Sequence, residues 1–162
     1  MVEKTKMILT LIIPHQGRKV LLGMKKRGFG KGRWNGFGGK LEPGETIENS
    51  AKRELCEEAG IEAGKLEQLG IVDFEFQNNP EISEVHIFKV HEFKGVPKES
   101  EEMAPKWFFV DEIPFKEMWG DDPYWLPIFL QGKKFRGYFL FAPGDKVIEH
   151  RVKIGGFTEP LM

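Results

Sequence analysis

The sequence predicts an α/β domain built around a mixed β-sheet. Runs rich in Phe, Val and Ile alternate with turn residues along most of the chain, as strands do. Two further segments have the capping residues that are typical of helices. The chain has 162 residues, and no linker-like stretch divides it. We therefore expect a single domain over residues 1–162, large enough to bury a hydrophobic core.

Seven segments are expected to form strands, because β-branched and aromatic residues crowd them between turn residues. These segments are Lys6–Ile13, Lys19–Lys25, Leu69–Phe76, Glu84–His91, Lys106–Val110, Tyr138–Phe141 and Val147–Ile154. The first apolar run, Met7 to Pro14, is far shorter than the roughly 20 residues that a membrane span needs. It also closes on a proline and polar residues, so we expect a strand rather than a signal peptide.

Two segments are expected to be helical, Thr46–Ala59 and Asp122–Gln131. Thr46 can cap the first turn of the first helix, and Gly60 suits the left-handed position that follows its last turn. In the second helix, Asp121 or Asp122 offers the cap and Pro123 takes the first helical position.

Composition restricts the class of partner. Apolar residues make up 40% and charged residues 30% of the chain, which is typical of a globular protein. A net charge of −1 creates no field that attracts nucleic acid or acidic lipid, so we expect neither as a partner. The single cysteine, Cys56, cannot form an internal disulfide, and we interpret it as a small packed residue. We expect a cytoplasmic monomer that binds a small molecule.

The first predicted helix places three carboxylates on one face. Glu54, Glu57 and Glu58 stand at i, i+3 and i+4, in the last turn. The helix dipole disfavours anions there by about 0.3–1 kcal/mol each, and Arg53 is in an unfavourable order to offset this. One interpretation is a solvated acidic face. The other is a Mg²⁺ site, because hard carboxylate oxygens with room for water and phosphate suit that ion.

The wider string favours the metal site. Residues 39–61 match the pattern G-x5-E-x7-R-E-U-x-E-E-x-G-U, in which U is a bulky aliphatic residue. The fixed positions are Gly39, Glu45, Arg53, Glu54, Leu55, Glu57, Glu58, Gly60 and Ile61. The chain therefore resembles the Nudix hydrolases.

The resemblance implies a Nudix fold, an α/β/α sandwich with a loop–helix–loop motif. It also implies that Glu54, Glu57 and Glu58 bind Mg²⁺, for which Mn²⁺ could substitute, while Glu45 and Arg53 brace the loop against the helix.

A glycine-rich segment, residues 28–39, precedes this motif. Its glycines let backbone N–H groups approach phosphate oxygens closely, although a flexible turn is the alternative. It lacks the Gly-Lys-Ser/Thr of a P-loop and the third glycine of the dinucleotide fingerprint. Lys25, Lys26 and Arg27 stand just before it and could meet a triphosphate, or could simply face solvent.

A closer resemblance covers nearly the whole chain, from Thr10 to about Tyr138. The strings GMKKRGFGKGRWNGFGGK, ESEEMAPKWF, IPFKEMWGDDPYW and KKFRGYF are similar to the animal oxidised purine nucleoside triphosphatases of the MutT-homologue group. That group releases a nucleoside monophosphate and pyrophosphate, which removes mutagenic precursors from the nucleotide pool.

The second resemblance implies roles for single residues. It implies that Asn35 bonds the base, that Phe29 and Phe74 line the pocket, and that Trp119 stacks on the purine. Further implied contacts to the nucleotide, the metal ion or its water come from Thr10, Lys25, Gly38, Gly39, Glu102, Asp121 and Asp122. Among these, Asp121 and Asp122 would contact the base edge, Gly38 would lend its carbonyl to the metal, and Glu102 would assist the metal and its water.

Elementary chemistry supports these roles and leaves alternatives. An aromatic platform contributes about 1–3 kcal/mol per stacked base. Two adjacent carboxylates in a dry pocket cannot easily both ionise, so one can donate a hydrogen bond. The alternatives are core packing for Trp119 and Trp125, and a helix cap for Asp121 and Asp122.

Two other functions stay open from the sequence. One is a Nudix enzyme for a sugar nucleotide or a dinucleoside polyphosphate. The other is a Nudix-fold binding protein without turnover, although none of the motif carboxylates is missing. Glu58 and Glu102 are both candidates for the general base.

Overall fold

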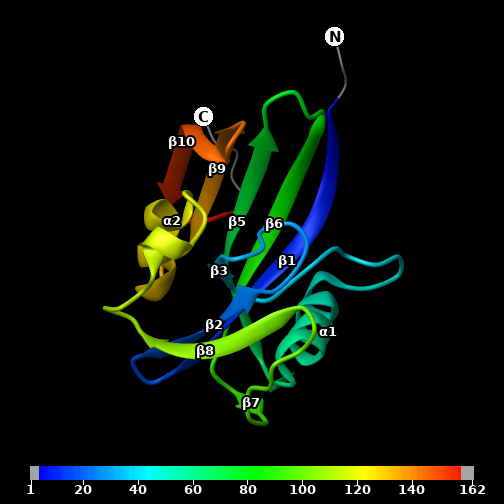
Figure 1. Ribbon diagram of the computed structural model, residues 1–162, viewed down its shortest axis with the longest axis vertical. Helices are drawn as coiled ribbons and strands as arrows, with labels where there is room; N and C mark the ends of the chain where they lie inside the picture. Colours follow the sequence, from blue (N-terminus) through cyan, green and yellow to red (C-terminus); the bar gives the residue numbers. More distant parts are fainter. Residues whose placement is uncertain (1–3, 158–162) are drawn as a thin grey trace.

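The computed structural model describes residues 4–157 (Figure 1). In this range, eight strands form one sheet and two short strands form another. The large sheet contains, in spatial order, β10 (Lys146–Ile154), β9 (Phe135–Ala142), β5 (Leu66–Phe76), β6 (Glu81–Val90), β1 (Thr5–Gln16), β2 (Lys19–Lys25) and β3 (Trp34–Asn35), with β8 (Met103–Phe109) also paired to β2. The small sheet pairs β4 (Glu62–Ala63) with β7 (Phe93–Lys94), and the helices are α1 (Ile47–Ala59), the short 3-10 helix η1 (Phe115–Glu117) and α2 (Asp122–Leu130).

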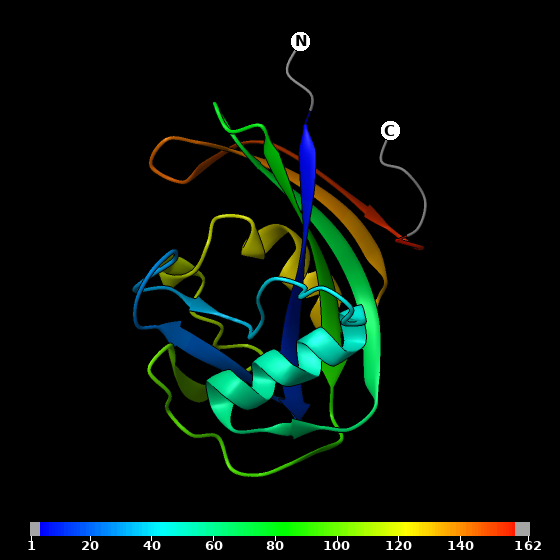
Figure 2. The same ribbon diagram turned by 90° about the vertical axis from the view of Figure 1, so that its right-hand side faces the viewer.

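The large sheet is mixed, which confirms the expected fold class. β1 runs parallel to β6 and β5 runs parallel to β9, while the other neighbours are antiparallel. All seven expected strands are present. β1 continues past Ile13, where the predicted strand ended, because His15 and Gln16 pair with the start of β2. Figure 2 shows how strongly the long strands curl.

Alternation along the strands supplies two separate cores, one on each face of the sheet. Ile12 of β1 packs in a core that contains Leu55 of α1. The next residue, Ile13, packs in the other core with Phe129 of α2. Figure 1 accordingly shows α1 near β1 and β8, and α2 beside β9 and β10. This arrangement is the expected α/β/α sandwich.

The first helix begins and ends as the sequence predicts. The Thr46 side chain accepts a hydrogen bond from the Asn49 N–H at 3.1 Å, and Gly60 has φ 70°, in the left-handed region. The interpretation of Cys56 as a small packed residue was wrong, because this side chain is exposed. Its neighbour Leu55 is fully buried, so Cys56 lies on the outward side of the helix.

The second helix ends at Leu130, one residue before the predicted end. Asp121 occupies the cap position, but its side chain makes no capping hydrogen bond, so the expected side-chain cap is wrong. Its carboxylate accepts instead from the indole of Trp125. No helix in residues 4–157 combines the length and apolarity that a membrane crossing requires.

Candidate active site

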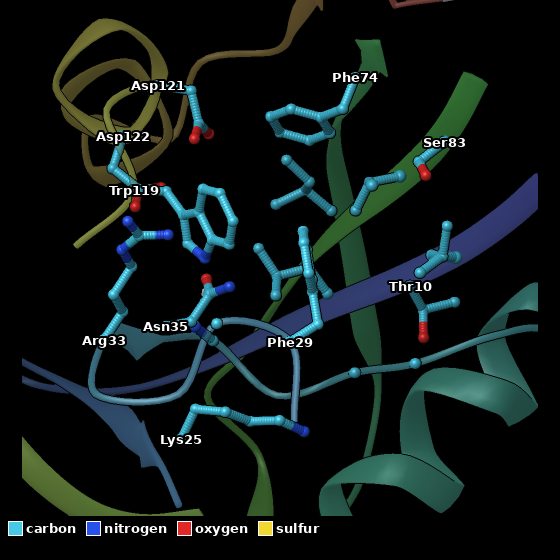
Figure 3. A pocket seen from close by; sticks show the side chains of 18 of the residues that line it. Thr10, Lys25, Phe29, Arg33, Asn35, Phe74, Ser83, Trp119, Asp121 and Asp122 are labelled. Atoms are coloured by element: carbon cyan, nitrogen blue, oxygen red, sulfur yellow. Dashed lines mark hydrogen bonds between the residues drawn. The ribbon is translucent and has the colours of Figure 1, made fainter. Parts of the chain in front are cut away.

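A cavity of about 400 Å³ opens between β1, β5, β6, α2 and the glycine-rich segment (Figure 3). Every residue to which the closer resemblance gave a nucleotide contact lines it, whereas Lys26 and Arg27 do not. The lining residues with such a contact are Thr10, Lys25, Phe29, Asn35, Gly38, Gly39, Phe74, Trp119, Asp121 and Asp122. Glu58 of the acidic helix lines the same cavity, so the two predicted groups meet in one place.

Aromatic rings form one wall of the cavity. Alternation along β5 puts Phe74 and Phe76 on the same face, and Phe141 of β9 stacks on Phe76 with centroids 5.1 Å apart. Trp119 is 9% exposed and meets Phe141 edge-on at 5.7 Å. Phe29 lies across from the indole at 5.0 Å and is 72% exposed, so it stands at the mouth. Trp119 therefore both packs in the core and lines the cavity.

Two carboxylates lie at the deep end of the cavity. Asp121 and Asp122 are 3% and 2% exposed. Burial raises the pKa of Asp121 to about 6, and the hydrogen bond from the Trp125 indole partly opposes this. Burial and the neighbouring charge of Asp121 raise the pKa of Asp122 well above its ordinary value. A pair of this kind holds a proton at neutral pH more readily than two solvated aspartates do.

Two buried polar atoms in the cavity have no partner among the described residues. They are the Thr10 hydroxyl Oγ1 and the Asp122 oxygen Oδ2. Buried polar groups are normally hydrogen-bonded, so unpaired atoms on a cavity wall indicate that a ligand pairs with them. Asn35 is already engaged on one side, because its Oδ1 accepts from the Gly36 N–H at 2.8 Å.

On the acidic helix, Arg53 is the centre of an ion-pair network. Its Nε lies 2.7 Å from Glu45 Oε2, and its Nη1 lies 3.0 Å from Glu54 Oε1 and 3.2 Å from Glu57 Oε2. The expectation that Arg53 does little to offset the carboxylate repulsion is therefore wrong, because one guanidinium reaches several partners at once. Its hydrogen bond lowers the pKa of Glu45 to about 2. Loop and helix are thus joined at Glu45.

Glu58 faces the cavity rather than solvent. Its side chain is 6% exposed, and Oε1 accepts from the Gly38 N–H at 2.9 Å. Burial, together with the charges of Glu54 and Glu102, raises the pKa of Glu58 to about 7 against the opposing Gly38 hydrogen bond. The Glu54 carboxylate lies against Gly39, where an added Cβ would come within 2.6 Å of Oε1. A side chain at position 39 would therefore require the Glu54 carboxylate to move.

Glu102 comes from the loop before β8 and pairs with the cations that precede the glycine-rich segment. Lys25 Nζ lies 3.1 Å from Oε2, and Arg27 Nε donates to Oε1 at 2.7 Å. These bonds lower the pKa of Glu102. Ser100 links this loop to the acidic helix, since its hydroxyl donates to the Glu58 backbone carbonyl at 2.9 Å. The loop that contains Glu102 is therefore hydrogen-bonded to α1 through Ser100.

This geometry agrees with a comparison to known families. The model of the NUDIX domain matches residues 5–129, which include both the acidic helix and most of the cavity. The chain belongs to the Nudix family.

Similar Nudix proteins cover nearly the full length of the chain. The oxidized purine nucleoside triphosphate hydrolase of Mus musculus is 52% identical over 149 residues, which are 92% of this chain and 96% of that protein. The protein of the same name from Danio rerio is 51% identical over 91% of this chain and 95% of that one. A MutT protein from Bacillus halodurans has a crystal structure that matches with a TM-score of 0.82 at 29% identity, over 95% of this chain and 99% of that one.

Nudix hydrolases generally use divalent metal ions, and the donor set here fits one. Glu54 and Glu58 are hard oxygen donors whose mutual repulsion a cation would relieve. Among residues 4–157, however, no three acidic, His or Cys side chains converge as a preformed cluster. The reason is that Arg53 holds Glu54 and Glu57, while Lys25 and Arg27 hold Glu102.

Several cavity residues had no role in the sequence analysis. They are Arg33, Phe76, Ser83, Val85, Trp125 and Phe141. Phe76 could have been found by period-two alternation from Phe74, and Val85 from Ser83 in the same way. Arg33 gives no such signal, because its position depends on the path of the glycine-rich segment.

Proposed function

We propose that this Nudix hydrolase cuts oxidised purine nucleoside triphosphates to the monophosphate and pyrophosphate, using Mg²⁺. The observation that supports it most is the pairing of a buried dicarboxylate with an aromatic platform. Asp121 and Asp122 adjoin Trp119 in a cavity that also contains Glu58 of the acidic helix. The names of the mouse and zebrafish relatives point to the same substrate class.

Base recognition is assigned to the deep end of the cavity. A purine stacks on Trp119 and presents its edge to Asp121 and Asp122. Oxidation at C8 replaces an acceptor at N7 by a donor N–H, and oxidation at C2 of adenine changes the other edge. A pair that shares a proton can accept or donate from either member, so it can bind both products. Asn35 donates to the base through its side-chain Nδ2, and Phe29 and Phe74 enclose the base.

The phosphates extend toward the acidic helix. Lys25 contacts them, and Thr10 contributes its unpaired hydroxyl to the nucleotide. The glycine segment ending in Gly38 and Gly39 lets the chain approach without side-chain obstruction. Glu58 and Glu102 are the two candidates for accepting the proton of the attacking water.

Mg²⁺, or Mn²⁺ in its place, would be held by Glu54, Glu57, Glu58 and the Gly38 carbonyl, with help from Glu102. The chemistry supplied by the bound ion is neutralisation of phosphate charge and activation of water. Arg53 and Glu45 act as braces, since their 2.7 Å contact fixes the loop relative to the helix.

We further propose that residues 1–162 form one domain and act as a cytoplasmic monomer on free nucleotides. The family match ends at residue 129, but β9 and β10 beyond it belong to the same sheet and supply Phe141 to the cavity. The proposed domain ends, residues 1–3 and 158–162, lie outside the described residues. The single cysteine and the net charge of −1 support the location and the absence of a nucleic-acid partner.

A turnover screen with Mg²⁺ tests this function. It compares 8-oxo-dGTP, 2-hydroxy-dATP, dGTP and dATP with a sugar nucleotide and a dinucleoside polyphosphate, and it identifies the products. We expect the oxidised triphosphates to give the highest kcat/KM, with monophosphate and pyrophosphate as products. Preference for a sugar nucleotide would favour the alternative Nudix enzyme. Binding without turnover of any compound would favour a sensor.

A further inference from the structure

Arg33 links the aromatic platform to a distant hairpin. Its guanidinium carbon lies 4.1 Å from the centroid of the Trp119 ring, over the indole. Its Nη1 lies 2.9 Å from Oδ2 of Asp145, in the turn between β9 and β10. Figure 3 shows Arg33 on one side of the indole, and Phe74 and Thr10 on the other. The cation therefore covers one face of the Trp119 ring, and Phe74 lies on the side of the opposite face.

The backbone around Arg33 brings it to this position. Its N–H donates to the Gly30 carbonyl at 3.1 Å, and its carbonyl accepts from the Lys25 N–H at 3.1 Å, which closes the loop between β2 and β3. Gly30 has φ 84° and lies against the indole, where an added Cβ would be 3.3 Å from Nε1 of Trp119. The loop and the platform are thus in direct contact.

The guanidinium is only partly enclosed by protein. A second, open hollow of about 500 Å³ lies beside the loop, and both Arg33 and Asp145 line it. The two side chains are 31% and 36% exposed, so their ion pair is partly shielded from water. Asp145 is therefore the contact that keeps Arg33 on the indole rather than in solvent.

Asp145 also occupies an unusual backbone position. Its φ is 61°, in the left-handed region, and its N–H closes the turn on the Ala142 carbonyl at 3.1 Å. Glycine and asparagine suit this conformation at least as well as aspartate does. Backbone geometry alone therefore does not explain an aspartate here, whereas the ion pair to Arg33 does.

We propose that Arg33 and Asp145 form a positioning pair that fixes Trp119 for base stacking and so sets the affinity for the purine. The pair rests on the proposed function, since it acts only through the base platform. The guanidinium occupies one face of the indole and leaves the other face, toward Phe74, for the base. It also restrains the glycine-rich loop, which packs on the same ring. Both residues lie at the base platform rather than on the acidic helix.

The main test is Asp145→Asn, which keeps a residue suited to left-handed φ and removes only the charge. We expect KM for 8-oxo-dGTP to rise by about 2- to 10-fold, with kcat within about twofold of wild type. Arg33→Gln should raise KM at least as much. The double variant should be no worse than Arg33→Gln alone, because Asp145 acts through Arg33.

Asp111→Asn is the matched control. Asp111 pairs with Arg18 at 3.8 Å, the two side chains are 69% and 75% exposed, and neither lines the cavity. We expect wild-type kinetics from it. A wild-type KM in Asp145→Asn would overturn the proposal, and so would effects of the two changes that multiply in the double variant. A fall in kcat with unchanged KM would also overturn it.

Calorimetric titration of 8-oxo-dGMP, run in parallel, reports the platform without turnover. We expect weaker binding by the same factor in Asp145→Asn, with an unchanged thermal midpoint. If the wild type binds the monophosphate but hydrolyses no oxidised triphosphate, the proposed function is refuted. The role of Arg33 and Asp145 is then decided by whether Asp145→Asn weakens binding of 8-oxo-dGMP. A wild type that neither binds nor hydrolyses overturns both proposals.

Discussion

Asp121 Oδ2 accepts a hydrogen bond from Trp125 Nε1 at 2.7 Å, one helical turn further along α2. The bond ties one carboxylate of the buried pair to a tryptophan of the core. Asp122 differs, because its Oδ2 has no partner among residues 4–157. The two aspartates are therefore unequal, with Asp121 held by the protein and Asp122 available to a ligand.

This inequality predicts different effects of the two isosteric substitutions. Asp122→Asn should lower kcat/KM for 8-oxo-dGTP and 2-hydroxy-dATP by roughly 3- to 10-fold or more, as expected when one buried hydrogen bond is lost. Asp121→Asn keeps an acceptor for Trp125 and should change the ratio between the two bases rather than only the rate. Values of kcat/KM for four nucleotides, oxidised and normal, measure this. Unchanged kcat/KM values in both variants would contradict the assignment of Asp121 and Asp122 to base recognition and would leave only the Nudix hydrolase activity.

The same pair predicts a pH dependence of stability. Burial raises the pKa of Asp121 to about 6 and that of Asp122 well above the ordinary value, whereas the unfolded chain titrates near about 3.9. The folded state binds more protons, so the contribution of the pair is full below about pH 4, and the part due to Asp121 is lost as pH rises through about 6.

Replacing Asp122 by Asn removes one of these ionisations. We expect the thermal midpoint of Asp122→Asn, relative to wild type, to rise between about pH 5 and pH 8, by about 2–4 °C per kcal/mol. The measurement is paired thermal unfolding with a chelator present and Asp111→Asn as the exposed control. A difference that is constant over this range would contradict the raised pKa values.

The proposed metal site predicts a separation of activity from folding. Glu57→Gln and Glu58→Gln should each lower turnover by about a hundredfold or more, since bound metal supplies several kcal/mol to the reaction. Folding should persist in both variants. In Glu58→Gln the new amide oxygen can still accept from the Gly38 N–H, and the removal of clustered charge relieves repulsion.

The control for this test is Glu48→Gln, an exposed acidic residue in the first turn of the same helix. Turnover with Mg²⁺ is compared with thermal unfolding in its absence and presence. Wild type and the control should gain stability on Mg²⁺ addition, and the two metal-site variants should gain less. Near-normal turnover in both Glu57→Gln and Glu58→Gln would contradict the proposed metal site.

Gly38 predicts a steric effect that needs no ligand. A Cβ at this position would lie 1.7 Å from the Thr10 carbonyl oxygen, which belongs to the backbone of β1 and cannot turn away. Gly38→Ala should therefore lower the thermal midpoint by roughly 2–12 °C, the range expected for overpacking by 1–3 kcal/mol. Gly156→Ala, where nothing lies within 4 Å, is the control. Equal midpoints for the two variants would show that the loop moves freely.

Local signals explain why much of the fold could be predicted. The cap at Thr46 and the left-handed Gly60 both depend on residues within one helical turn, and both predictions were confirmed. Alternation in β5 likewise depends only on neighbouring positions. The two-residue strands β3, β4 and β7 were missed, because so short a segment has no periodicity and becomes a strand only by pairing with a distant partner.

The sequence predicted site residues whose positions follow from a motif. It did not predict which of several possible partners a side chain would contact. Spacing alone put Glu54 and Glu58 on one side of a helix. It could not show that Arg53 reaches four nearby carboxylates, because that choice depends on the path of the loop. Nor could it show that the Asp121 carboxylate would accept a hydrogen bond from Trp125 instead of capping α2, since that hydrogen bond is favoured only when both groups are buried.

The parallel pairing of β5 with β9 has a consequence for how the protein folds. Glu75 and Tyr138, which lie on these strands and share a hydrogen bond, are 63 positions apart in the chain. Contacts of such separation form late, because a long loop must close before they contribute. On the ribosome, the acidic helix can therefore form well before the aromatic wall that completes the cavity. A nascent chain interrupted before Phe141 would display the family motif yet have no place to hold a base.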